Sequence, residues 1–178
     1  MISYAYFRRI ARILCCCLFL CSLGTYVYAR KTNTNYREAA VSAFSTANDT
    51  FAKTRFHEAY EYCDQTVSAA RRAINFEGLT AEETQQMKDL IRQADNKKQQ
   101  IMGILRHFKV LISEKKIARG MTPEQVQASW GEPQDIKKNL YQAKETQEWR
   151  YGDVLTDNDK YVFFSNGIVE DWADKTKK

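Results

Sequence analysis

The sequence predicts an α+β protein in which a helical region precedes a small domain of one short helix and a sheet. Between residues 36 and 116 the chain has no proline, and its apolar residues recur every three or four positions, which is the period of a helix. From residue 117 onward the chain contains both of its prolines and segments in which aromatic and polar residues alternate, which is typical of strands. The predicted boundaries are 36–116 for the helical region and 117–173 for the α+β domain.

Residues 1–29 have the three-part pattern of a secretory signal peptide. The basic start contains three arginines, Arg8, Arg9 and Arg12. An apolar run follows at Ile13–Leu23, and Val27-Tyr28-Ala29 places acceptable side chains where signal peptidase binds. We therefore expect cleavage after Ala29, export to the periplasm or outer membrane, and a flexible polar lead over residues 30–35.

Two other interpretations of this segment stay open. Ile13–Ala29 reaches the lower limit for a membrane anchor, although Gly24 and Thr25 weaken its apolar character. A lipid on Cys21 is the other alternative, but Leu20 before it is large for a lipoprotein signal.

An antiparallel helical hairpin is predicted after the lead. The first helix has apolar positions spaced four, four, three and four residues apart: Tyr36, Ala40, Phe44, Ala47 and Phe51. The second helix has the same kind of face: Phe56, Tyr60, Cys63, Val67, Ala70 and Ile74. The short segment Lys53–Arg55 is the expected turn, and so short a connection makes neighbouring helices antiparallel.

Cysteine usage excludes an internal disulfide framework. Cys63 is the only cysteine after residue 29, so the exported chain cannot form an intramolecular disulfide. Its place on the apolar helix face predicts a buried, small apolar side chain, with an intermolecular disulfide as the alternative.

A third, long helix is predicted to begin after Thr80. Thr80 and Glu83 form the pattern of a capping box, in which each side chain satisfies a backbone N–H of the first turn. Apolar residues then continue at helical spacing from Met87 to Leu111, a helix of unusual length. Gly120 is expected to end it, since glycine adopts the left-handed conformation without strain.

The short helix of the second domain is predicted from its capping residues. Thr122 is the expected N-cap, Pro123 suits the first helical position, and Gln125 completes a capping box. Gly131 follows Trp130 and is expected to stop the helix there.

Three antiparallel strands are then expected, at residues 148–151, 161–164 and 168–172. Asn166-Gly167 is the preferred turn for a two-residue hairpin between the last two. Counting outward from that turn gives five facing pairs: Ser165 with Ile168, Phe164 with Val169, Phe163 with Glu170, Val162 with Asp171, and Tyr161 with Trp172. This pairing would place Tyr161, Phe163 and Trp172 on one face of the sheet.

The second domain resembles a known family through an ordered set of motifs. These are Gly120-Met121-Thr122 with Val126, Trp130-Gly131-Glu132-Pro133, Trp149-Arg150-Tyr151, and Tyr161–Val169 with its Asn-Gly turn. Together they resemble the SmpA/OmlA (BamE-type) outer-membrane assembly family over residues 117–172. The resemblance implies two helices packed on a three-stranded antiparallel sheet, and a periplasmic protein-binding role close to outer-membrane β-barrel assembly. The same fold is similar to that of β-lactamase-inhibitor proteins, so an inhibitor or ligand-binding module acting on a soluble target is the alternative.

No catalytic, cofactor or metal site is predicted, and we expect a protein that is not an enzyme. The two histidines, His57 and His107, fall in different helices, and no nucleophile, phosphate-loop or metal-ligand pattern occurs. Part of the net charge of +5 belongs to residues 1–29, which leaves too mild an excess to predict a nucleic-acid partner. The basic tail, residues 174–178, suggests a peripheral membrane contact as an alternative to a solvated end.

A protein partner in the envelope is the predicted ligand, and the oligomeric state is left open. Aromatic side chains often anchor protein interfaces, so the sheet supplies the candidates. They are Trp149, Tyr151, Tyr161, Phe163 and Trp172.

Overall fold

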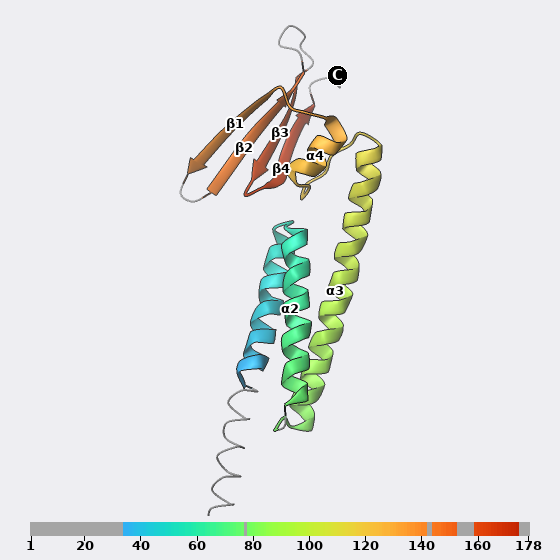
Figure 1. Ribbon diagram of the computed structural model, residues 1–178, viewed down its shortest axis with the longest axis vertical. Helices are drawn as coiled ribbons and strands as arrows, with labels where there is room; N and C mark the ends of the chain where they lie inside the picture. Colours follow the sequence, from blue (N-terminus) through green and yellow to red (C-terminus); the bar gives the residue numbers. More distant parts are fainter. Residues whose placement is uncertain (1–33, 77, 142–143, 153–158, 175–178) are drawn as a thin grey trace, which may run out of the picture. The chain divides into compact units, whose positions relative to one another are not determined.

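The computed structural model describes residues 34–76, 78–141, 144–152 and 159–174, and these form an α+β fold (Figure 1). The helices are a segment over residues 34–52, α2 (Phe56–Asn75), α3 (Ala81–Ser113) and α4 (Pro123–Trp130). The strands are β1 (Asp135–Tyr141), β2 (Lys144–Tyr151), β3 (Lys160–Ser165) and β4 (Ile168–Asp174). The predicted signal peptide and most of the basic tail lie outside the described residues, whereas residues 34 and 35 of the predicted lead are helical.

The chain divides into two compact units, which are described separately. The first contains the described part of the chain up to Ser45 together with Tyr62–Asp95, and the second contains Thr46–Glu61 and the chain from Asn96 onward. The boundary expected at residues 116 and 117 falls inside the second unit, which includes helical residues as well as the sheet.

The core of the first unit is built largely from small side chains. Its four buried members are Ala40, Ala70, Ala73 and Met87. Outside this core, Arg37 Nη1 lies 2.5 Å from Glu83 Oε1. Glu83 also accepts a hydrogen bond from the Thr80 N–H at 2.8 Å, and Thr80 Oγ1 accepts one from the Glu83 N–H at 3.1 Å. The capping box predicted for the start of α3 is therefore confirmed.

The predicted hairpin and its turn are also confirmed. Residues 53–55 connect the first helical segment to α2, and Cys63 is fully buried on the predicted face. The turn has a Schellman geometry, in which Arg55 N–H donates to Thr50 O at 2.9 Å and Thr54 N–H donates to Phe51 O at 3.0 Å. Thr54 takes the left-handed position, with φ +59°.

The prediction that Gly120 ends the long helix is wrong. α3 ends at Ser113 in a second Schellman motif, where Lys116 N–H donates to Leu111 O and Lys115 N–H donates to Ile112 O. Lys115 itself takes the left-handed conformation, with φ +57°. This helix end could not be recognised in the sequence, because the left-handed position that glycine usually occupies carries a lysine.

Gly120 instead allows two segments to approach closely. Its φ is +85°, and a Cβ added there would lie 2.6 Å from Phe56 Cε2 and 2.8 Å from Thr54 O. Both neighbours belong to the start of α2 and the turn before it, within the second unit. A side chain at this position would therefore meet both a ring and a backbone oxygen.

The short helix α4 forms as predicted. Thr122 Oγ1 accepts from the Gln125 N–H, and Gln125 Oε1 accepts from the Thr122 N–H at 2.9 Å. Gly131 has φ +86°, and its N–H donates to Gln127 O at 2.8 Å, which closes the helix. Val126 and Ser129 are the buried residues of its inner side.

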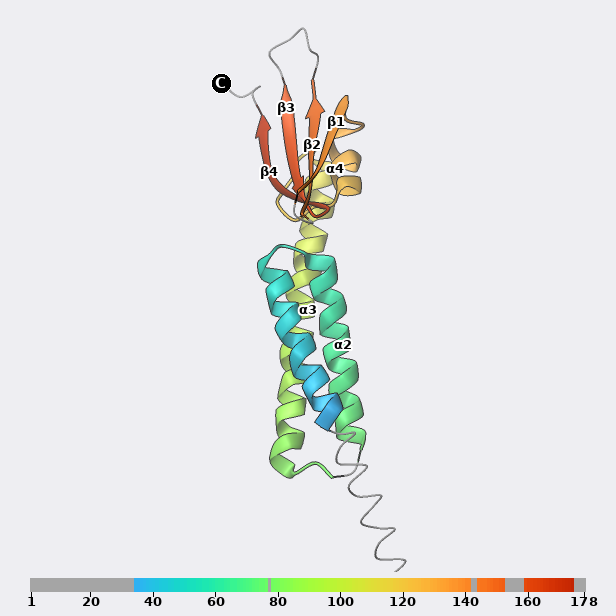
Figure 2. The ribbon, with the colours of Figure 1, turned by 90° about the vertical axis from the view of Figure 1, so that its left-hand side faces the viewer.

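The sheet has four strands, not three, in the simple order β1-β2-β3-β4 with every neighbour antiparallel. The helix α4 lies against one of its faces (Figures 1 and 2). β1 was missed because its sequence, DIKKNLY, does not bury an alternating apolar face: Asp135–Leu140 are all exposed. Periodicity can identify a strand only where one face is covered.

An irregularity between β3 and β4 changes the predicted pairing beyond the turn. Ser165 does face Ile168 and Phe164 does face Val169. A register shift next to Phe163 then changes the other three pairs: Phe163 faces Asp171, Val162 faces Trp172, and Tyr161 faces Ala173. Since facing residues share a side of the sheet, Trp172 lies on the side of buried Val162, opposite to Tyr161 and Phe163.

Candidate partner-binding surface

Two of the five candidate residues belong to the core of the second unit. Trp149 and Tyr151 are only 6% and 8% exposed, respectively. The Trp149 ring centroid lies 4.7 Å from that of Phe164, and the Tyr151 ring meets Trp130 edge-on at 5.5 Å. Tyr151 thus packs against α4 and Trp149 packs within the sheet, so neither offers a partner more than a margin of its surface.

The other three candidates keep exposed surface but do not form one patch. Phe163 and Trp172 are each 38% exposed, and Tyr161 is half-buried. Phe163 and Tyr161 share the face of the sheet opposite to α4, which we call the outer face, while Trp172 lies on the inner face near the β4 edge. The register shift separates these aromatic residues, and the sequence alone gave no sign of it.

Phe163 is surrounded by charged residues on the outer face. Its cross-strand neighbours are Glu148 on β2 and Asp171 on β4. Glu148 Oε1 lies 3.7 Å from Lys137 Nζ, and Asp171 Oδ1 lies 3.6 Å from Arg119 Nη2. Because these pairs are exposed, they add little stability to the fold, but they give the outer face an apolar centre with a charged rim.

Tyr161 is held in place at one end of the outer face. Its hydroxyl donates a hydrogen bond to Asp159 Oδ2 at 3.0 Å. This hydrogen bond raises the pKa of Tyr161, and the little burial it has and the negative charge of Asp159 act in the same direction. The phenol is protonated at neutral pH, as tyrosine ordinarily is, and can serve as a polar contact on the same face as Phe163.

The edge next to Trp172 is partly covered by the chain itself. Gly120 N–H donates to Val169 O at 3.0 Å, and Val169 N–H donates to Met121 O at 2.8 Å. These bonds occupy the beginning of β4, so a partner strand could not pair along its whole length.

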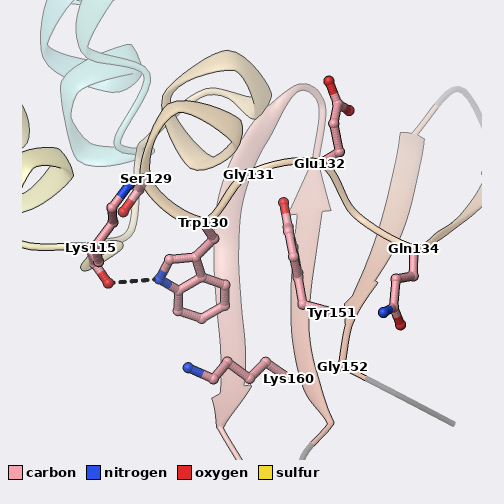
Figure 3. Close-up of a pocket in the computed structure, with 9 residues that line it drawn as sticks. All are labelled: Lys115, Ser129, Trp130, Gly131, Glu132, Gln134, Tyr151, Gly152 and Lys160. Carbon is pink, nitrogen blue, oxygen red and sulfur yellow. Dashed lines mark hydrogen bonds between the residues drawn. The ribbon is translucent and has the colours of Figure 1, made fainter.

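A pocket of about 530 Å³ lies beside α4 and was not anticipated from the sequence (Figure 3). Its lining comes from segments far apart in the chain: Lys115, Ser129, Trp130, Gly131, Glu132, Gln134, Tyr151, Gly152 and Lys160. Trp130 Nε1 donates to Lys115 O at 2.9 Å, and Lys160 Nζ stands 5.1 Å from the centre of the Trp130 ring. Both contacts stabilise the wall of the pocket.

The Tyr151 hydroxyl is buried and has no hydrogen-bond partner among the described residues. Burial of the ring, and to a lesser degree the negative charge of Glu132, raise the pKa of Tyr151 to about 12. A phenol with this pKa is neutral at physiological pH and cannot act as a general base there.

In the part of the chain that the structure describes, no group of three or more His, Cys, Asp or Glu side chains could hold a metal ion. Among those same residues, no helix combines the length and the apolar character that crossing a bilayer requires.

Comparison of the chain with protein-family models, with curated proteins and with solved structures finds no match. The resemblance to the outer-membrane assembly family therefore remains a prediction from motifs.

Proposed function

We propose that this chain is an exported cell-envelope protein whose second unit binds a protein partner through the outer face of the sheet, in a role linked to outer-membrane assembly or integrity. The observation that supports it most directly is Phe163, a large aromatic residue 38% exposed at the centre of a charged face. Phe163 shares this face with Tyr161, and aromatic residues are among those that most often anchor interfaces.

The chemistry of the outer face fits an interface better than a catalytic site. An aromatic side chain can supply most of the binding energy when a partner covers it, and the charged rim then selects the partner by complementarity. Around Phe163 the rim carries both signs, with Lys137 and Arg119 positive and Glu148 and Asp171 negative. Such a rim favours a partner surface with matched charges rather than a purely basic or acidic one.

Export and the BamE-like character come from the sequence. The signal-peptide pattern of residues 1–29 supports export from the cytoplasm, and the motifs of residues 117–172 support the compartment in which barrel proteins are assembled. The intact mass of the protein recovered from an envelope fraction tests the first point. A chain beginning at Arg30 is expected, and an unprocessed chain confined to the cytoplasm would overturn export.

Site-specific photocrosslinking tests the binding face. Phe163 is replaced by the photoreactive p-benzoylphenylalanine in cells, and Gln100, an exposed residue of α3, receives the same replacement as the control. We expect an adduct with an envelope protein from position 163 and none from position 100. We also expect Phe163→Ala, introduced beside a crosslinker at Tyr161, to reduce the adduct roughly tenfold, because truncating an interface aromatic often costs more than 1 kcal/mol.

Each outcome bears on one part of the proposal. Equal adducts from positions 163 and 100 would show that the outer face is not special. An adduct with a soluble enzyme would instead favour the inhibitor-type module on the same fold.

A further inference from the structure

β1 is an edge strand, and no other strand of the described residues covers its free side. On its other side it pairs with β2. Every residue from Asp135 to Leu140 is exposed. Proteins usually protect such an edge, because its free peptide groups can pair with another chain.

The free peptide groups of β1 can be assigned from the hydrogen bonds of its neighbour. Asn166 N–H donates to Glu145 O at 2.8 Å, so Glu145 directs its peptide groups toward β3. Direction alternates along a strand, and therefore Thr146 and Glu148 direct theirs toward β1. Their partners in β1 are Asn139 and Lys137.

Because direction alternates along β1 as well, the residues between these partners and beside them direct their N–H and C=O groups outward, away from β2. These residues are Ile136, Lys138 and Leu140.

The same three residues also share one face, because their partners across β2 are Trp149, Gln147 and Glu145. Ile136 is 43% exposed and Leu140 is 76% exposed. Two large apolar side chains, four residues apart, thus flank Lys138 along the open edge. An added strand could cover both of them while its backbone bonds to the outward peptide groups.

Charge decides what kind of strand fits. An antiparallel partner that places apolar residues opposite Ile136 and Leu140 must place its central residue opposite Lys138. Opposite charges in facing positions stabilise a strand pair and like charges destabilise it. The best partner therefore has an acidic residue at its centre, flanked two positions away on each side by apolar residues.

A second copy of this chain fits poorly. If β1 pairs with itself so that Ile136 faces Leu140, Lys138 faces the Lys138 of the other copy. The β4 sequence does contain Ile168, Glu170 and Trp172 at the right spacing, but the Gly120–Met121 segment occupies that edge at Val169.

We infer that β1 is a docking edge for an extended segment of a different protein, with the pattern apolar–any–acidic–any–apolar, which adds to the sheet as a fifth, antiparallel strand. This inference goes beyond the proposed function. It concerns the opposite edge of the sheet and requires neither Phe163 nor Trp172, so it can fail or succeed independently of the outer face.

A designed peptide tests the charge rule. The fluorescein-labelled peptide Thr-Val-Thr-Glu-Thr-Val-Thr is titrated with the full-length chain and binding is followed by fluorescence anisotropy. A matched peptide with Lys in place of Glu is the control. We expect the Glu peptide to bind about tenfold more tightly. Lys138→Glu should reverse that preference, whereas Lys109→Glu, on an exposed site of α3, should leave it unchanged. Equal binding of both peptides would overturn the inference.

A pair of variants at one position tests the backbone. Lys138→Thr and Lys138→Pro both remove the charge, but only proline removes the outward N–H, and it leaves the bonds between β1 and β2 intact. With unchanged far-UV circular dichroism, Lys138→Thr should still bind the Glu peptide weakly and Lys138→Pro should not bind it. Equal binding by the two variants would exclude strand addition. Dimers of the unmodified chain in sedimentation that disappear with Lys138→Pro would show that a second copy, not another protein, covers β1.

Discussion

Replacing Gly120 with alanine should destabilise the second unit more than the same replacement at Gly131 or Gly103. Two effects add. With φ at +85°, a residue with a Cβ costs about 1–2 kcal/mol. The Cβ would also approach Phe56 Cε2 to 2.6 Å and Thr54 O to 2.8 Å, distances that force a shift of structure costing about 1–3 kcal/mol. We therefore expect Gly120→Ala to lower the free energy of unfolding by about 2–5 kcal/mol.

Two other glycines separate these contributions. Gly131 has φ +86° and ψ −165°, a region that is essentially confined to glycine, and an added Cβ there meets nothing within 4 Å, so Gly131→Ala should show a backbone cost without crowding, about 1–3 kcal/mol. Gly103 lies inside α3 and is also uncrowded. Gly103→Ala should stabilise the protein by about 1 kcal/mol, because alanine is the better helix former.

Urea unfolding followed by tryptophan fluorescence is the appropriate assay. All three tryptophans, Trp130, Trp149 and Trp172, lie in the second unit, so the signal reports on the unit that contains the three glycines. The reasoning about close approach is refuted if Gly120→Ala costs no more than the backbone contribution alone, about 1–2 kcal/mol. If neither Gly120→Ala nor Gly131→Ala lowers the free energy of unfolding, the claim that a positive φ at these positions strains an alanine is also wrong.

Three further predictions concern pH, capping and a helix end. Burial, assisted by the charge of Glu132, raises the pKa of Tyr151 to about 12, so the folded state retains a proton that the unfolded chain loses near its ordinary pKa of 10.0. That contribution to stability is present below about pH 10 and is lost as the pH rises toward 12; Tyr151→Phe should make the urea midpoint less dependent on pH in this window. Thr122→Ala should cost about 1 kcal/mol in urea unfolding by breaking the α4 capping box, and Thr122→Ser should restore most of it. Lys115→Gly should raise the thermal midpoint, because glycine removes the strain of about 1 kcal/mol that a non-glycine residue has in the left-handed conformation. A lower midpoint would contradict the assignment of Lys115 to that conformation.

Several elements were determined by local sequence. The helical segment over residues 34–52, α2 and the cap of α3 follow from the spacing of apolar residues and from Thr80 with Glu83. α4 follows from Thr122, whose capping side chain acts on its own neighbours. Such signals can be recognised in the sequence because each depends on residues only a few positions apart.

Other features had no recognisable signal in the local sequence. The end of α3 at Ser113 and the exposed strand β1 are examples, since no glycine marks the first and no buried face marks the second. The register shift beside Phe163 depends on how β3 and β4 fit together, and it moved Trp172 to the other face of the sheet.

The candidate surface shows the same division. Sequence identified the aromatic residues but could not separate buried Trp149 and Tyr151 from exposed Phe163, because burial depends on where α4 packs. Aromatic residues that alternate with polar ones indicate that a strand has one covered and one exposed side. Only the tertiary structure decides which face is covered, since a one-residue shift in register exchanges the two sides.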